Sequence, residues 1–176
     1  MPVTTRNTYE FLPAGRPAPD FRLTAIKTNQ PISPKACAGR PLGLVFHGQH
    51  TVQAVVDINT AVRPLYPQPS QVTLASVVDL SAVPRLLHRM VQPFLERAYD
   101  EAASHIPEGY EPADYVFLLP DWDGRTSKAF NVKHADKTAA IVVIDGAGNV
   151  VGSYQGPEPG PATLRLVQQA MGAAAG

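Results

Sequence analysis

Residues 138–156 constrain the fold more than any other part of the chain. Within them, residues 139–144 form an unbroken apolar run rich in isoleucine and valine, which is the pattern of a strand buried on both faces of a sheet. Residues 145–149 (DGAGN) tolerate positive φ, so the chain can reverse there in a short loop. Val150, Val151 and Tyr154 then resume a strand pattern. The segment predicts a β-hairpin whose first strand lies inside a sheet.

The remaining chain alternates between strand and helix patterns. Strands are predicted at residues 9–12, 21–25, 42–47, 71–79 and 115–119. Helices are predicted at residues 51–63, at 84–105, from the turn at 121–124 to about 130, and at 161–171, with residues 29–40 left as loop. This βαβαβαββα order predicts an α/β domain with a largely parallel central sheet, finished by the antiparallel hairpin.

Length and composition limit the domain organisation and the partners. A chain of 176 residues predicts one domain at residues 17–172, preceded by an N-terminal arm at 1–16 and followed by a frayed tail at 173–176. The 15 basic and 15 acidic side chains cancel, which removes the electrostatic case for nucleic acid or an anionic membrane as a partner. No basic and apolar leader opens the sequence and no apolar run approaches the ~20 residues of a membrane span. We therefore expect a cytoplasmic protein.

Four segments are informative through their order and spacing: residues 17–23 (PAPDFRL), 39–48 (GRPLGLVFHG), 117–132 (FLLPDWDGRTSKAFNV) and 141–156. Together they resemble the redoxin or peroxiredoxin (AhpC/TSA-like) branch of the thioredoxin-like superfamily. The resemblance covers about residues 17–172. It implies a thioredoxin-like α/β fold, in which helices flank a central mixed sheet that ends in a C-terminal β-hairpin and helix.

The redox chemistry of that family needs a cysteine at the N-terminus of the helix after the first central strand, where the helix dipole lowers the thiol pKa. Here Thr51 and Ala54 stand at the two CxxC positions, and Ala54 also stands at the peroxiredoxin cysteine position. The proline that relatives place before the hairpin is missing too, because residues 137–139 are Lys, Thr and Ala. The resemblance therefore implies a redoxin that has lost its redox centre.

Two functions follow from this loss. The first is a non-catalytic binding or interaction module without a cofactor, in which the former redox-site cleft holds an unknown protein or small molecule. Its expected binding residues are His47, Gln49, His50, Thr51, Ala54, Thr138 and Ala139. The second is an antioxidant oxidoreductase, a thiol peroxidase or thiol–disulfide exchange enzyme, that uses Cys37 or a partner's thiol. Cys37 is the only cysteine, so the chain has neither an internal disulfide nor a cysteine-based metal cluster.

Three further patterns have both a structural and a functional reading. His47 and His50 resemble a transition-metal pair, but they supply only two ligands, so we expect a polar loop rather than a metal site. Asp121-x-Asp123-Gly124 resembles the nucleophile loop of haloacid dehalogenase-type phosphatases; too little chain follows it for such a core, and a turn with Asp123 as helix cap explains it. The broad apolar face of residues 84–105 is expected to pack on the sheet, or in part against a second subunit of a homodimer.

Overall fold

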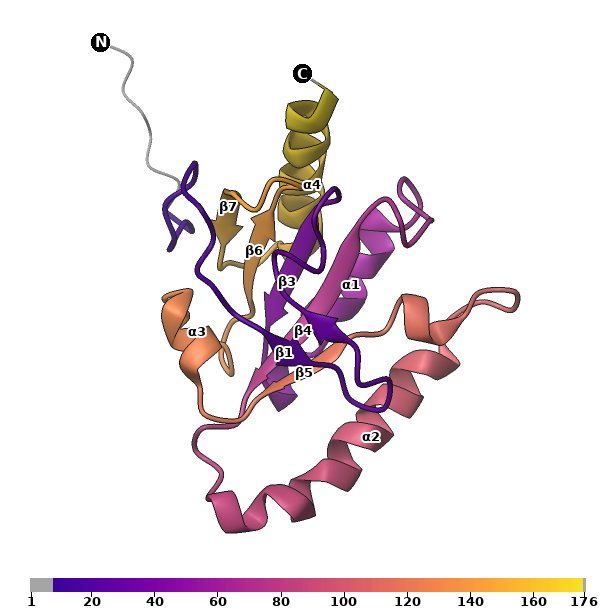
Figure 1. Ribbon diagram of the computed structural model, residues 1–176, viewed down its shortest axis with the longest axis vertical. Coiled ribbons are helices and arrows are strands. Elements are labelled where there is room, and N and C mark those ends of the chain that lie inside the picture. Colours follow the sequence, from indigo (N-terminus) through magenta and orange to yellow (C-terminus); the bar gives the residue numbers. More distant parts are fainter. Residues whose placement is uncertain (1–7, 176) are drawn as a thin grey trace.

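A five-stranded mixed sheet forms the centre of the protein in the computed structural model, which describes residues 8–175, with side chains as far as Gly172 (Figure 1). Its strands follow the order β5-β4-β3-β6-β7. Strands β3, β4 and β5 are parallel, whereas β6 is antiparallel to both of its neighbours. The bounds are β3 (Leu42–Phe46), β4 (Thr73–Asp79), β5 (Leu118–Asp121), β6 (Ala140–Ile144) and β7 (Val150–Tyr154). The mixed sheet that the resemblance implied is confirmed.

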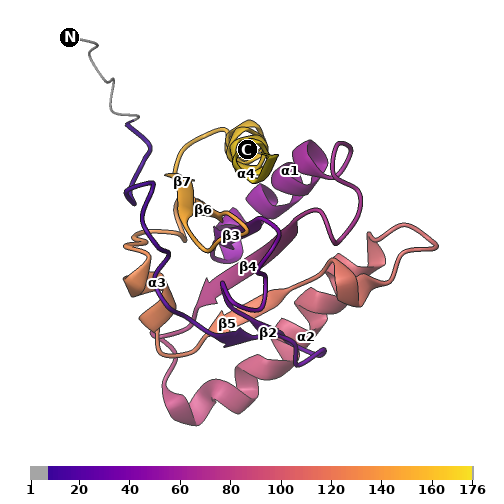
Figure 2. The same ribbon diagram turned by 45° about the horizontal axis from the view of Figure 1, so that its top comes forward.

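Helices cover both faces of this sheet (Figures 1 and 2). On one face, α1 (Gln53–Val62) and α4 (Pro159–Ala175) pack against each other, and α4 also packs against β6 and β7. The other face carries α3 (Arg125–Ala129) and the N-terminal segment. The long helix α2 (His88–Ser104) lies at the β5 edge, with 3₁₀ turns η2 (Arg85–Leu87) before it and η3 (Pro112–Asp114) after it. A further 3₁₀ turn, η1 (Gln49–Thr51), joins β3 to α1.

Strand β3 is buried on both faces, as the apolar run in the sequence predicts. Leu44 and Phe46 belong to the core under α3, whereas Val45 belongs to the core under α1 and α4. Successive side chains of a strand point to opposite faces, so a strand between two layers needs apolar residues at every position. Strand β3 is therefore the central strand, with a hydrophobic core on each of its faces.

The hairpin prediction is confirmed in strand bounds and in turn chemistry. The Asp145 Oδ1 atom accepts hydrogen bonds from the backbone N–H groups of Ala147 and Asn149 at 3.0 and 2.9 Å. Gly148 has φ +89°, the left-handed conformation that glycine adopts without strain. The side chain of Asp145 therefore organises the reversal between β6 and β7.

The N-terminal part of the chain is less regular than predicted. Residues 9–12 contain no strand; instead the N–H groups of Phe11 and Leu12 donate to the Ser153 hydroxyl. The strand at 21–25 shortens to β1 (Leu23–Thr24), which pairs with β2 (Pro31–Ile32) inside the predicted loop. Neither feature has an apolar period long enough to be visible in the sequence. Residues 1–7 of the predicted arm lie outside the described part of the chain.

Strand β5 begins three residues later than predicted and includes Pro120. Tyr115 instead ends η3. Proline is tolerated in β5 because this is the edge strand of the sheet, where one row of N–H groups has no partner strand.

The apolar face of residues 84–105, expected to pack on the sheet or in part against a second subunit, packs on the sheet only in part. Leu95 and Tyr99 are buried against β5, and Val91 is partly buried beside them, but Leu86, Met90 and Phe94 are exposed. The short edge strand β5 therefore covers only one side of α2. Among residues 8–175, no helix is long and apolar enough to cross a membrane. The last helix, α4, continues to Ala175, and Gly176 is not described.

Candidate functional site

The turn between β3 and α1, where thioredoxin-like enzymes carry their thiols, is held by Thr51. Its hydroxyl accepts a hydrogen bond from the Gly48 N–H at 2.9 Å and donates one to the Ala135 carbonyl at 2.6 Å. The second bond ties the start of α1 to the segment before β6. At this position Thr51 uses its oxygen atom for structure, so it presents no activated nucleophile.

Ala54 lies in the first turn of α1 and is buried. A methyl group here has no chemistry of its own, and it contributes to the packing of the helix start. Gln49 and His50, one turn earlier, are exposed. The two residues that replace the CxxC cysteines are thus positioned as the resemblance implies, at a helix N-terminus, but carry neither thiol.

His47 ends the central strand and is only 8% exposed. Its Nδ1 atom lies 3.0 Å from the Gly48 carbonyl oxygen. A carbonyl only accepts, so Nδ1 carries the proton and Nε2 presents a lone pair. Nε2 is buried and has no hydrogen-bond partner among the described residues. Burial lowers the pKa of the His47 imidazole, against a smaller opposite effect of the Gly48 hydrogen bond.

A cavity of about 220 Å³ adjoins His47 at the C-terminal ends of β3 and β4. Two acidic side chains, Asp79 and Asp136, line it together with the Ser81 and Ser127 side chains. The other lining residues are Phe46, Gly48, Val77, Ala82, Val132, His134 and Ala135. The lining combines apolar residues with several hydrogen-bonding groups, as ligand pockets do, in a volume below the ~300–1,000 Å³ usual for them.

Thr138 and Ala139 lie directly before β6, beside this turn. The antiparallel register pairs Phe46 with Ala140, so Ala139 lies next to His47. The Thr138 carbonyl accepts a hydrogen bond of 2.8 Å from the Gln155 side chain, which also donates to the Lys133 carbonyl. Residues 8–175 contain no cis peptide bond. The structure therefore brings Ala139 next to His47, while the Thr138 carbonyl is already bonded to the Gln155 side chain.

His47 and His50, the two histidines weighed as a metal pair, lie in different environments. His47 is buried and His50 is exposed. In the described part of the chain, no group of three or more histidine, cysteine or acidic residues is arranged to hold a metal ion.

Cys37 lies at the opposite end of β3 from this turn. It is 2% exposed and packs in the core with Leu42. Burial raises the pKa of the Cys37 thiol, and the charge of Arg40 and a hydrogen bond with Thr73 counteract this only in part. Thr73 pairs with Leu42 at the first position of β3, and β3 has five residues, so the strand alone separates the thiol from His47 by roughly 17 Å.

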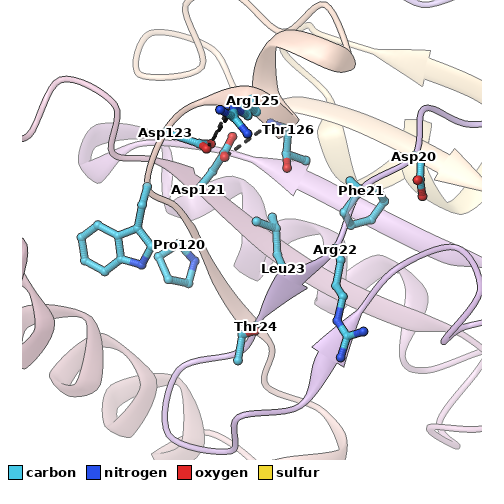
Figure 3. Close-up of a pocket in the computed structure, with 11 residues that line it drawn as sticks. Asp20, Phe21, Arg22, Leu23, Thr24, Pro120, Asp121, Asp123, Arg125 and Thr126 are labelled. Carbon is cyan, nitrogen blue, oxygen red and sulfur yellow. Dashed lines mark hydrogen bonds and ion pairs between the residues drawn. The ribbon is translucent and has the colours of Figure 1, made fainter. Parts of the chain in front are cut away.

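A second cavity, of about 460 Å³, lies between the segment before β1 and the turn after β5 (Figure 3). This cavity could not be predicted from the sequence, because its two walls are about a hundred residues apart along the chain. Its lining includes Phe21 and Leu23 on one wall and Trp122 and Thr126 on the other. Asp123 and Arg125 form an ion pair at its rim with a distance of 3.2 Å.

The Asp121 carboxylate in that cavity wall caps α3 together with the expected Asp123, whose Oδ1 atom accepts a hydrogen bond of 3.1 Å from the Arg125 N–H. The Asp121 carboxylate accepts hydrogen bonds from the Ser127 N–H at 2.7 Å, the Ser127 hydroxyl at 2.9 Å and the Thr126 N–H at 3.4 Å. Asp121 is 1% exposed. The reading of this loop as a phosphatase nucleophile is therefore wrong, because the carboxylate is enclosed and its oxygens are already bonded.

The comparison with solved structures identifies the fold. No protein-family model and no curated protein matches the chain. Solved structures do: a thiol:disulfide interchange protein of the thioredoxin family from Chlorobium tepidum has 16% identity and a TM-score of 0.60, with 89% of this chain and 96% of that chain covered. An exposed lipoprotein thioredoxin from Streptococcus pneumoniae has 14% identity and a TM-score of 0.60, with 85% and 98% covered. A thioredoxin-like protein from Aeropyrum pernix has 18% identity and a TM-score of 0.51, with 88% and 89% covered.

These likenesses establish the fold and leave the activity open, because the identities are low. The protein has a thioredoxin-like fold that spans nearly the whole chain. Its single cysteine, Cys37, is consistent with the loss of an active-site cysteine pair.

Proposed function

We propose that this protein is a non-catalytic binding module that uses the former redox-site cleft of a thioredoxin-like domain. The observation that carries the proposal is the position of the only thiol. Cys37 is enclosed in the core at one end of β3, whereas the helix N-terminus that would activate a thiol lies at the other end and carries Thr51 and Ala54.

The geometry around His47 supports a binding role for the same cleft. A buried imidazole nitrogen without a partner costs free energy, and such groups persist where another requirement retains them. Here the imidazole borders a cavity with acidic and hydroxyl side chains from three separate chain segments. Val52, which directly follows the turn at 49–51, is exposed and adds apolar surface there.

The alternative, an antioxidant enzyme that uses Cys37, needs a thiolate that can reach peroxide or a disulfide. Burial and a raised pKa both oppose this.

The four matching segments support a more specific origin among peroxiredoxin-like redoxins. The cytoplasm remains our proposed compartment, because a chain with one cysteine forms no internal disulfide and so does not depend on an oxidising environment for folding.

The first test is redox turnover. We expect no peroxide consumption with dithiothreitol, and no insulin disulfide reduction, above the rate of the reagent alone. Cys37→Ser should behave in the same way. Turnover that disappears in Cys37→Ser would establish an enzyme and overturn the proposal.

The second test locates binding. A photo-crosslinking residue replaces Gln49, at the cleft, or Gln169, which is exposed on α4 at a distance from it. We expect crosslinked products in cells that are specific to position 49. The same products from both positions, or none from position 49, would argue against a binding cleft at this turn.

A further inference from the structure

The outward side of η2 and α2 carries an apolar stripe that nothing in the described chain covers. Leu86, Met90 and Phe94 are 94%, 66% and 66% exposed. They are spaced four residues apart, so they form one row along the helix. We call these three residues the outer stripe. Helix α2 lies at the edge of the molecule farthest from α4, which leaves the stripe open to solvent (Figure 2).

A row of charged residues runs beside the outer stripe and changes sign along the helix. Arg85 and Arg89 lie in its first half, and Glu96 and Asp100 in its second half. Spacings of four, seven and four residues place all four side chains on the same flank. No ion pair of Arg85 or Arg89 is recorded among residues 8–175, whereas Asp100 pairs with Lys27 of the same chain.

We propose that the outer stripe is the interface with a second copy of this chain, with the two α2 helices antiparallel about a two-fold axis. In such a pair each flank meets the same flank of the other helix in the reverse direction. With the axis at Met90, the middle of the outer stripe, Arg85 of one copy then lies within one helical turn of Glu96 of the second copy, and the two stripes pack together between these pairs. A parallel pair would instead bring opposite flanks together and would leave these opposite charges apart.

The size of the surface predicts a dimer that exchanges with monomer. The stripe from Leu86 to Phe94 is roughly 12 Å long, at 1.5 Å per residue. A stable interface buries about 800 Å² on each partner, which is more than one helix face of this length provides. We therefore expect dimer formation to depend on protein concentration. The interface does not include the cleft at Thr51, so it is independent of the proposed binding role.

Sedimentation velocity over a series of concentrations tests the proposal. The native protein should shift from monomer towards dimer as its concentration rises. Met90→Glu with Phe94→Glu should remain monomeric throughout, while the control Val56→Glu, which alters an equally accessible apolar residue on α1, should dimerise as the native protein does. A native protein that stays monomeric, or a dimer that the stripe variant leaves intact, would overturn the interface.

Charge exchange tests the antiparallel direction. Arg85→Glu alone and Glu96→Arg alone should each raise the dimer dissociation constant by about tenfold, since the two-fold axis repeats every altered pair. The double variant, Arg85→Glu with Glu96→Arg, should recover the native value because the opposite charges are restored. Failure of the double variant to recover would overturn the antiparallel arrangement. Circular dichroism of each variant verifies that it is folded.

Discussion

The Thr51 hydroxyl donates a 2.6 Å hydrogen bond to the carbonyl of Ala135, 84 residues further along the chain. It joins the start of α1 to the segment before β6, which are the two walls of the cleft. The same oxygen accepts the Gly48 N–H. The Thr51 side chain therefore connects these two segments at the position where thioredoxin-like enzymes carry their reactive cysteines.

Thr51→Val should destabilise the protein by about 1–3 kcal/mol, because it removes both hydrogen bonds at nearly constant volume and leaves the Gly48 N–H unpaired. Urea denaturation followed by circular dichroism measures the change. Thr51→Ser keeps the hydroxyl and should lose less than half as much. Equal losses in the two variants would show that the methyl group, and not the hydroxyl, is responsible.

Thr51→Cys with Ala54→Cys should restore thiol–disulfide exchange. The two positions lie one helical turn apart at the start of α1, where the helix dipole lowers a thiol pKa and a disulfide can close. We expect insulin reduction to rise by about tenfold or more over the native protein. Thr51→Cys alone, which cannot close the ring, is the matched control and should stay near the native rate. No gain in the double variant would show that the cleft lacks more than its cysteines.

His47 should make the folded protein more stable at neutral than at acidic pH. Burial lowers the pKa of its imidazole from the usual 6.5, so the unfolded chain binds a proton that the folded chain resists. This stability is complete above pH 6.5 and is lost as the pH falls through the folded-state pKa.

The free energy of unfolding at pH 7.5 and 5.5, measured for the native protein and for His47→Gln, isolates this effect. The native protein should lose more stability between the two pH values than the variant does. His50→Gln, at the exposed neighbouring histidine, should follow the native profile. An unchanged pH dependence in His47→Gln would contradict the lowered pKa.

Cys37 should be protected from thiol reagents until the core opens. Its raised pKa reduces the thiolate fraction at pH 8, and its 2% exposure excludes a bulky reagent. Reaction with dithionitrobenzoate should therefore be slow in native buffer and complete at once in guanidinium chloride. Rapid stoichiometric labelling of the native protein would contradict the burial and would favour the oxidoreductase alternative.

Asp121→Asn should cost about 1.5–3 kcal/mol of stability, because the carboxylate accepts hydrogen bonds from Thr126 and Ser127 in a buried site. An amide at this position offers only one acceptor oxygen. Asp123→Asn, on the exposed side of the same turn, should change stability by less than about 0.5 kcal/mol. Thermal unfolding of both variants compares them. Similar losses would contradict the assignment of the main cap to Asp121.

Most of the fold could be predicted from the sequence where a pattern is long or chemically specific. The apolar run before Asp145 and the turn residues after it gave the hairpin, and the absence of thiols at Thr51 and Ala54 gave the loss of the redox centre. Strands β1 and β2 were not predicted, because two residues per strand are too few to show an alternation of apolar and polar side chains.

The features that only the tertiary structure decided all depend on segments distant in sequence. The sequence shows that Leu86, Met90 and Phe94 are apolar, but not that the short strand β5 leaves them uncovered. It shows Asp121 and Asp123 close together, but not that Asp121 is the one buried against α3. It shows His47, but not that its Nε2 atom is buried beside a cavity. Local sequence patterns determine which helix or strand forms, because they involve residues that are close together in the sequence. Burial and hydrogen-bond partners are determined by which elements then pack together, and no local pattern contains that information.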